Sequence, residues 1–353
     1  MSSWNSIQQE ILALNSPDQF DIVRRNKLKA VQEITGRPLV IYAVDFVGSH
    51  PIKAQLTDSL ISISLADKDS FDEVTRSLQK GSKIDILLHS PGGLAEATES
   101  IVALLRERFS HIRFIIPNVA KSAATMLAMS GEQLLMDDRS ELGPTDPQMI
   151  FRQDGRLIVA PAQAIKDQFK TAQDEINNDP KKLPSWVPIL GWYGPALLTQ
   201  CDNHLALAAE LVSKWLKQYM FAGNPEGEEK AEKLAEYLAN HNKFRSHSRR
   251  VGMADLQTYG ANILDMRTEP ELHDAVRDLY TAITLTFSHT GAYKIVENSD
   301  GEALIGMLNF NVQQQPPQEP VSTDVPTTSP IEPFLASAPN RQARRQASKK
   351  KKR

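Results

Sequence analysis

Two turns in the chain carry the residue types that acyl-transfer chemistry requires. Gly92-Gly93 follows an apolar run and precedes a patterned helix, and Ser122 opens the next helix with Ala123 and Ala124 behind it. The N–H groups of a diglycine turn can point into a cleft with no Cβ in the way. Ser122 is therefore a candidate nucleophile, and the N–H groups of Gly93 and Ala123 form a candidate oxyanion hole. A plain tight turn and a helix N-cap explain the same spacing, so both interpretations stay open.

The elements that position these turns are two consecutive strand–turn–helix units within residues 83–148. Apolar runs predict strands at 84–88, 114–116 and 133–136, with a helix after each of the first two turns. Strands that alternate with helices at this spacing favour parallel βαβ units. The loops at the C-terminal ends of such strands gather ligands and catalytic groups.

The flanking sequence predicts further elements on both sides of this core. The pattern predicts two helices within residues 1–35, a strand at 38–47, a short strand around 60–63, a helix at 67–78, a hairpin turning at 153–155, a helix from 161, an irregular aromatic loop at 177–195, and helices at 205–221, 228–238 and 269–287. The N-terminal helices could form a lid on the core or a subunit contact, and we favour the contact. The aromatic loop could bind an unfolded peptide, but we expect its rings to pack on the body or on a neighbouring subunit.

Composition is that of an ordinary globular protein. The chain has 353 residues, 41% of them apolar and 24% charged, a length at which one core with large appendages, or two domains, is expected. Its one cysteine, Cys201, excludes an intrachain disulfide and is consistent with a reducing cytoplasm. The N-terminus lacks a signal-peptide pattern, and no stretch approaches the ~20 apolar residues that span a bilayer. We therefore expect a cytoplasmic protein with no membrane span.

The C-terminal region differs in character from the rest. From about residue 313 the chain is rich in proline and polar residues, which predicts a disordered linker. The last fourteen residues hold eight basic side chains, although the whole chain carries a net charge of −3. This tail is a candidate contact for nucleic acid, an acidic surface or the protein's own body, and a solvated tail without a partner fits equally well.

Three motifs in order, HSPGG at 89–93, SAAT at 122–125 and LGPTDPQ at 142–148, give the chain a family resemblance. It resembles the ClpP/crotonase-like superfamily, and within it the signal-peptide-peptidase-A-like serine peptidases, especially the serine dehydrogenase proteinases. The resemblance covers residues 36–175 well and extends loosely to about 265. It implies an α/β fold with a repeated β-β-α spiral core, added N- and C-terminal helices and a disordered tail. By the same resemblance Ser122 is the nucleophile, Gly92, Gly93 and Ala123 provide the oxyanion donors, and residues 142–147 form a structural turn.

The resemblance also suggests a domain organisation. N-terminal helices occupy 1–35, the catalytic core 36–175, a helical extension 176–300, and the linker with its basic tail 311–353. Relatives enclose their sites in rings or stacked dimers, so a homo-oligomer is expected, supported by the amphipathic helices after residue 200.

The sequence does not identify which residue acts as the general base. Relatives use either a histidine about 25 residues after the serine, which is absent here, or a lysine from a later helix. Lys166 and Lys170 lie on the predicted helix after the hairpin, and His247 is the rival because histidine needs little tuning to act at neutral pH. A chain with no functional base is the third possibility. Lys121 is expected to point elsewhere, and His89 to support the glycine turn by hydrogen bonding.

Three functions fit these residues. The leading hypothesis is a serine peptidase that acts on peptides or unfolded proteins without a cofactor or a metal. The alternatives are a crotonase-type enzyme that polarises an acyl-CoA thioester, and a non-catalytic oligomeric scaffold. No G-x-G-x-x-G segment opens a helix, so nothing indicates an oxidoreductase.

Overall fold

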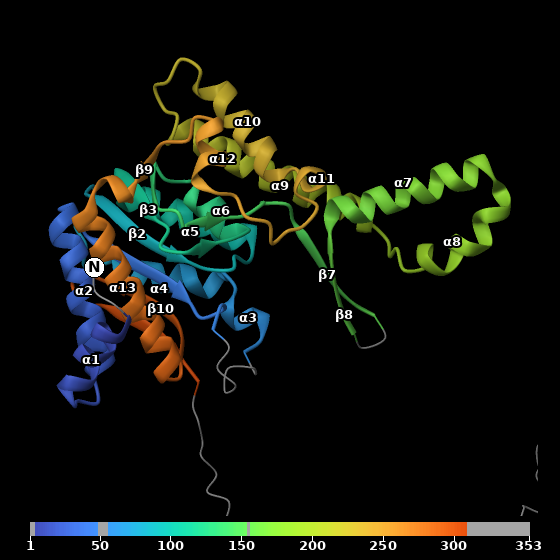
Figure 1. Ribbon diagram of the computed structural model, residues 1–353. Helices are drawn as coiled ribbons and strands as arrows, with labels where there is room; N and C mark the ends of the chain where they lie inside the picture. The colour runs from blue at the N-terminus through green and yellow to red at the C-terminus, as the bar shows by residue number, and fades with distance from the viewer. Residues whose placement is uncertain (1–3, 49–55, 154–155, 309–353) are drawn as a thin grey trace, which may run out of the picture. The chain divides into compact units, whose positions relative to one another are not determined.

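A seven-stranded sheet forms the centre of the protein in this computed structural model, which describes residues 4–48, 56–153 and 156–308 (Figure 1). Five neighbouring strands are parallel, β10 is antiparallel to the first of them, β1, and the edge strand β11 is antiparallel to β10. In spatial order the strands are β11 (Ala303–Met307), β10 (Ala292–Asn298), β1 (Leu39–Val44), β2 (Lys83–His89), β3 (His111–Ile115), β5 (Gln133–Met136) and β9 (Ile263–Asp265).

Both faces of this sheet are covered, as strand β1 illustrates. All six of its residues are buried, and they alternate between two hydrophobic clusters. Tyr42 and Val44 belong to one cluster, and Ile41 and Ala43 to the other. Strands buried on both faces have continuous apolar sequences, which is why β1 is apolar without alternation.

Helices form a layer on each face of the sheet. The larger cluster includes residues of α4 (Leu65–Thr75), α5 (Ala95–Arg108), α6 (Ala123–Ala128), α9 (Leu197–Gln218), α10 (Gly227–Ala239) and α12 (Met253–Thr258). The other face packs on α2 (Gln19–Thr35) and α13 (Pro270–His289), and α1 (Trp4–Leu14) packs on these two helices. Both predicted N-terminal helices are thus confirmed as elements: α2 covers the sheet, and α1 lies against α2 and α13 (Figure 1).

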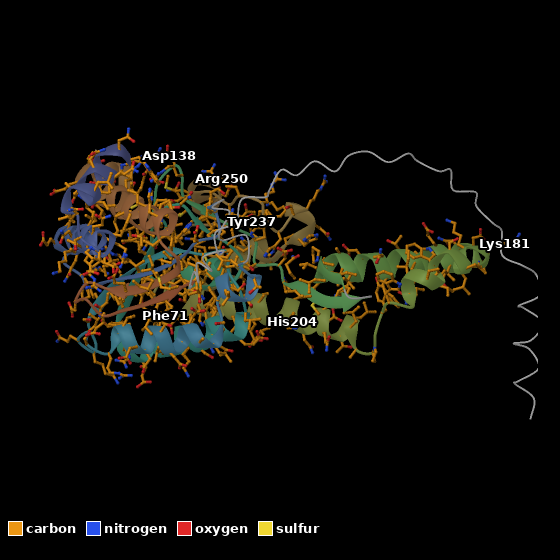
Figure 2. All side chains as sticks on the ribbon, turned by 90° about the horizontal axis from the view of Figure 1, so that it is seen from below. Phe71, Asp138, Lys181, His204, Tyr237 and Arg250 are labelled. Atoms are coloured by element: carbon orange, nitrogen blue, oxygen red, sulfur yellow. The ribbon has the colours of Figure 1, made fainter. Side chains whose placement is uncertain are left out.

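A hairpin and two helices follow the core. The predicted hairpin is confirmed as β7 (Gln148–Gln153) paired with β8 (Arg156–Pro161), and the helix after it as α7 (Ala162–Asn178). The prediction of an irregular loop at 177–195 was wrong, because residues 183–190 form helix α8 (Leu183–Leu190). Proline is tolerated in the first turn of a helix, so the Pro184 signal that suggested a loop fits this helix start. Figure 2 shows Lys181 at the outer end of this segment.

Two other sequence predictions need correction. The short strand expected around 60–63 is helix α3 (Asp58–Ile61), and only Ile63 makes a β-bridge, to Gly93. The stretch 176–300, expected to be helical, also contains β9 and β10, which join the central sheet. β10 and β11 are a hairpin whose turn contains Asn298 and Gly301, a recognisable turn signal.

The mixed α/β class predicted from the sequence is confirmed. No helix within residues 4–48, 56–153 and 156–308 has the length and apolar character needed to cross a bilayer. The proline-rich linker and the basic tail lie outside the described residues.

Candidate active site

A ribbon of five short chain segments holds the candidate site together. β4 (Val119–Ala120) pairs in parallel with β6 (Glu141–Leu142) at its centre. Outside β4, Ser90 bridges Ala120 and Gly93 bridges Ile63, both in parallel. Outside β6, Leu142 bridges Val251 in antiparallel orientation. The ribbon order is therefore residue 63, residues 90–93, β4, β6 and residue 251.

The direction of these segments brings the predicted site residues to one edge. The three central segments run parallel, so Gly93, Ser122 and the turn after Leu142 follow them at the same edge. The segment that contains Val251 runs the opposite way, so its preceding residues, including His247, lie at this edge too. Neighbouring strands lie roughly 4.8 Å apart. The ribbon thus gathers residues that are far apart in sequence.

Ser122 occupies a strained turn between β4 and α6. Its φ is 54° and its ψ is −124°, a region that side-chain-bearing residues rarely adopt. Such a conformation costs on the order of 1–3 kcal/mol and concentrates at functional sites. Ser122 is partly exposed, whereas the α6 residues behind it are buried. The turn therefore holds the serine at the surface, in a strand-to-helix arrangement typical of a nucleophile.

The diglycine turn lies directly against this serine. A Cβ on Gly92 would lie 2.7 Å from Ser122 Cβ and 2.9 Å from Ala123 N, and the φ of Gly92 is +102°. Both the space and the backbone angle therefore require glycine here. The structure brings Gly92, Ser122 and Ala123 together as the sequence predicted.

Two backbone N–H groups are unused at this position. Ile63 N donates to Gly92 O at 2.7 Å, and Leu94 N donates to Ile63 O at 3.0 Å. This pairing uses the residues on either side of Gly93 and turns its own N–H away from Ile63. Within the described residues, neither Gly93 N–H nor Ala123 N–H donates to a protein acceptor. Both remain available to a substrate oxygen.

A buried carboxylate holds two histidines at the same edge. Asp146 is 1% exposed, and its Oδ1 accepts a hydrogen bond from His247 Nδ1 at 2.8 Å. Its Oδ2 accepts one from His241 Nδ1, also at 2.8 Å. A neutral imidazole that donates through Nδ1 has Nε2 left as an acceptor. Asp146 therefore orients both rings with an accepting nitrogen directed away from the carboxylate.

Further hydrogen bonds tie this acidic turn and the His247 segment to the serine. Gly143 N donates to Thr125 Oγ1 at 3.0 Å, which links the turn to α6. Lys121, next to Ser122, donates through Nζ to Leu142 O at 2.9 Å and to Arg249 O at 3.5 Å. His247 precedes Arg249 by two residues. Its segment is separated from β4 by β6 alone. Two strand spacings, roughly 10 Å, therefore separate the two segments.

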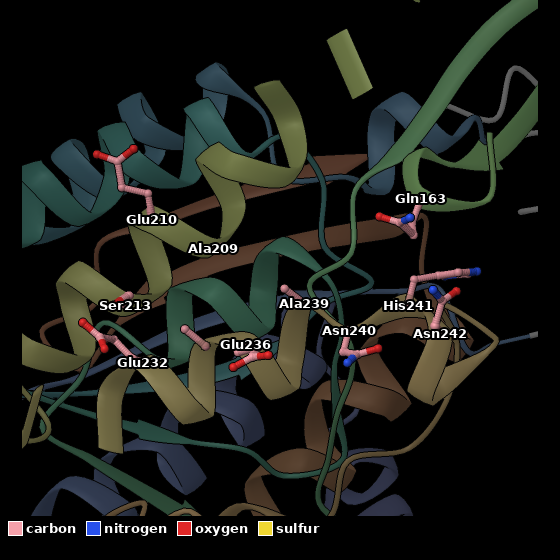
Figure 3. Close-up of a pocket in the computed structure, with 11 residues that line it drawn as sticks. Gln163, Ala209, Glu210, Ser213, Glu232, Glu236, Ala239, Asn240, His241 and Asn242 are labelled. Carbon is pink, nitrogen blue, oxygen red and sulfur yellow. The ribbon is translucent and has the colours of Figure 1, made fainter. Parts of the chain in front are cut away.

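His241 has a different environment from His247. It belongs to α11 (His241–Phe244) and lines a cavity of about 640 Å³ between α9 and α10, shown in Figure 3. Gln163 at the start of α7 lines the same cavity. His241 therefore borders a cavity lined by residues outside the ribbon, although both histidines are hydrogen-bonded to Asp146.

The structure does not bring the predicted lysines into the ribbon. Lys166 forms an ion pair with Asp202 on α9, and Lys170 pairs with Asp174 on its own helix at 3.4 Å. Lys121 pairs with Glu141 at 3.1 Å, so its amine lies along β6. Each amine is directed to a carboxylate rather than to the serine turn.

His89 supports β4 from below the site. It is 4% exposed, and its Nδ1 lies 3.1 Å from Val119 O, while its Nε2 lies 3.4 Å from the Tyr280 hydroxyl. Burial lowers the pKa of His89 to about 4, and the Val119 hydrogen bond opposes this only in part. His89 is therefore neutral at pH 7 and buried, and its hydrogen bonds go to β4 and Tyr280 rather than to the glycine turn that it was expected to support.

This burial predicts a loss of stability in mild acid. The pKa of His89 is about 4 in the folded chain, against an ordinary value of 6.5. Its contribution is therefore complete above pH 6.5 and disappears as the pH falls towards 4. We expect a loss of about 2 kcal/mol at pH 5 and about 3 kcal/mol in full. Urea unfolding at pH 7.5 and pH 5 tests this, with His89→Phe as the control that lacks the titrating group. Equal pH dependence in both proteins would contradict it.

The sequence does not predict the hydrogen bonds that join Asp146 to His241 and His247. It places Asp146 only in a structural turn, and His241 is not among the predicted site residues. The signal was available in part: two histidines six residues apart, and an aspartate between threonine and proline in a turn next to the serine helix. Nothing local indicates that these segments meet. Within the described residues, no group of three or more histidine, cysteine or acidic side chains is arranged to hold a metal ion.

Comparison with known proteins gives a family for part of the chain. Residues 60–178 match the family described as ClpP-like SDH-type serine proteinase. Two uncharacterised proteins of Methanocaldococcus jannaschii are each 33% identical over 87 residues, which is 25% of this chain and 30% of each relative. The matched part thus spans about a third of these curated relatives.

Two solved structures match the chain at low similarity. A 1510-N membrane-bound stomatin-specific protease has 17% identity and a TM-score of 0.36, with 60% of this chain and 79% of that chain covered. ClpP1 from Listeria monocytogenes has 12% identity and a TM-score of 0.35, with 69% of this chain and 98% of that chain covered. The likeness to a ClpP-like serine proteinase family therefore rests on the match over residues 60–178.

Proposed function

We propose that this chain, whose residues 60–178 match the ClpP-like SDH-type serine proteinase family, hydrolyses peptide bonds with Ser122 as nucleophile, His247 as general base and Asp146 as the residue that orients the base. The observation that carries the proposal is the ribbon edge. There, a strained serine, two unused N–H groups and an Asp–His pair converge from separate parts of the chain.

The proposed chemistry follows from these groups. Ser122 Oγ attacks the peptide carbonyl carbon as its proton passes to His247 Nε2. The N–H groups of Gly93 and Ala123 hold the resulting oxyanion, and the Asp146 carboxylate stabilises the imidazolium. The imidazolium then gives its proton to the leaving amine. A water molecule, activated by the same imidazole, hydrolyses the acyl-enzyme and regenerates Ser122.

The choice of His247 over Lys166 rests on hydrogen-bond partners. A general base must have a free lone pair within reach of the nucleophile. The Nδ1 bond to Asp146 leaves His247 Nε2 as that lone pair, on a segment bound to the serine turn through Lys121. The Lys166 amine is bound to Asp202 on another helix. In the part of the chain that the structure describes, His247 therefore has an acceptor nitrogen without a competing partner on a segment tied to the serine turn, whereas the Lys166 amine is paired with a carboxylate on another helix.

Self-association and unfolded peptide substrates belong to the same proposal. On the β7–β8 hairpin, Ile150, Leu157 and Val159 are 52–63% exposed, although they alternate with residues that pack inward. A strand pair that is apolar on both faces is normally covered on both faces. This outer face supports contact with another polypeptide.

Labelling with an active-serine probe tests the proposal directly. We expect a fluorophosphonate to modify the native protein once, and peptide mapping to locate the adduct on Ser122. Heat-denatured protein should not react, because the activated serine depends on the folded ribbon. Absence of labelling together with absence of peptide hydrolysis would leave the scaffold hypothesis instead.

A further inference from the structure

A buried ion pair lies behind the candidate oxyanion hole. Lys294 of β10 donates to Asp67 of α4 at 2.8 and 3.1 Å, and the two side chains are 13% and 3% exposed. α4 and β10 are in contact in the fold (Figure 1). Neither residue belongs to the groups assigned to the chemistry above.

This pair fixes both sides of Ile63. Lys294 Nζ also donates to Ser62 O at 3.0 Å. Asp67 Oδ2 accepts from Ser64 N at 2.7 Å and from Ser64 Oγ at 3.1 Å. The backbone groups of the residues before and after Ile63 are thus held by one cation and one carboxylate.

Ile63 in turn fixes the diglycine turn. Its N–H and its carbonyl pair with Gly92 O and Leu94 N, as described above. The approach is so close that a Cβ on Gly93 would lie 2.3 Å from Ile63 N and O. A shift of Ile63 would therefore move Gly93 and the direction of its N–H.

We infer that Lys294 and Asp67 are positioning residues for the oxyanion hole, acting on Gly93 N–H through Ser62, Ile63 and Ser64. The kinetic consequences rest on the proposed function, whereas the positioning itself does not. A buried pair of this kind is sensitive to loss of one partner, since the remaining charge is uncompensated. Among the described residues, Lys294 is the only cation paired with Asp67.

Lys294→Met tests the inference, with Arg113→Met as the matched control. Arg113 pairs with Asp85 at 2.7 Å, with side chains 14% and 0% exposed, near the N-terminal ends of β2 and β3. Both variants lose a cation from a pair of similar burial, although Asp85 keeps Arg37 at 3.8 Å as a second cation. Only Lys294→Met should accelerate amide hydrogen exchange in peptides covering residues 62–64 and 92–94. Lys294→Arg keeps the cation and should restore protection.

The kinetic readout separates positioning from general destabilisation. Loss of one oxyanion donor lowers kcat by about 10²-fold, so Lys294→Met should lower kcat by roughly 10- to 100-fold with KM within about threefold. Affinity for a peptide aldehyde, whose adduct places an oxyanion in the hole, should fall in parallel. Arg113→Met should keep kcat within about threefold of wild type.

The outcomes distinguish the positioning of Gly93 by Lys294 and Asp67 from the proposed peptidase function. Equal exchange at 62–64 and 92–94 in Lys294→Met and wild type would overturn the inference whatever the activity. Faster exchange in a protein whose wild type neither hydrolyses peptides nor reacts with the probe would uphold the positioning and refute the proposed function. Should Lys294→Met not fold, the Asp67→Asn/Lys294→Met double variant removes the unpaired carboxylate, and the same exchange comparison applies.

Discussion

Replacing Ser122 with alanine is expected to lower kcat for a fluorogenic peptide by about 10⁵-fold or more, because no other group in the site replaces the attacking hydroxyl. The fold should be unaffected, since alanine retains the Cβ and Ser122 Oγ has no hydrogen bond to another described residue. Initial rates with active-site titration give the measurement. Thermal unfolding verifies that the variant is folded.

Ser122→Gly provides an informative control. The φ of 54° at this position is unfavourable for serine and favourable for glycine. We therefore expect Ser122→Gly to be as inactive as the alanine variant, yet more stable than wild type by about 1 kcal/mol. Hydrolysis of an acyl-CoA thioester that survives in either variant would contradict the peptidase and favour the crotonase-type alternative.

Replacing Asp146 with asparagine is expected to lower kcat by roughly 10³- to 10⁴-fold. The asparagine amide keeps one acceptor oxygen for the two histidines, and where its NH2 group faces His247 it favours the tautomer with hydrogen on Nε2. That tautomer cannot take the proton of Ser122. The measurement is kcat and KM for the same peptide, with circular dichroism to monitor folding.

Three further variants identify the base. His247→Gln should lower kcat by about 10³-fold, and combining it with Ser122→Ala should add little, because the two residues act as a unit. Lys166→Met should remain within about threefold of wild type, since its amine is bound to Asp202. His241→Gln retains a donor to Asp146 and should cost less than His247→Gln. Loss of activity in Lys166→Met with activity retained in His247→Gln would identify the lysine as the base instead.

Local sequence patterns were sufficient to predict the strands and helices that position Ser122, the candidate nucleophile. The apolar run of β2, the diglycine turn and the small residues of α6 lie close together in sequence, and strand–turn–helix geometry depends on such short-range patterns. The same reasoning predicted β5 and the β7–β8 hairpin. It failed for α8, where proline at a helix start was read as a loop.

The proposed base could not be predicted from local patterns. His247 lies 125 positions after Ser122 in the sequence, and only the β6–Val251 bridge brings its segment back to the serine turn. A lysine on a nearer helix was an equally reasonable prediction until the Lys166–Asp202 pair gave its amine another partner.

The sequence by itself thus determined the α/β class and the serine with its diglycine turn, because strand and helix periodicity and the freedom of glycine are properties of a few adjacent residues. Only the tertiary structure shows that His247 is hydrogen-bonded to Asp146 and that Lys294 and Asp67 hold the residues on either side of Ile63. Those contacts, from His247 to Asp146 and from Lys294 to Asp67, join segments 101 and 227 residues apart, and no local pattern records them.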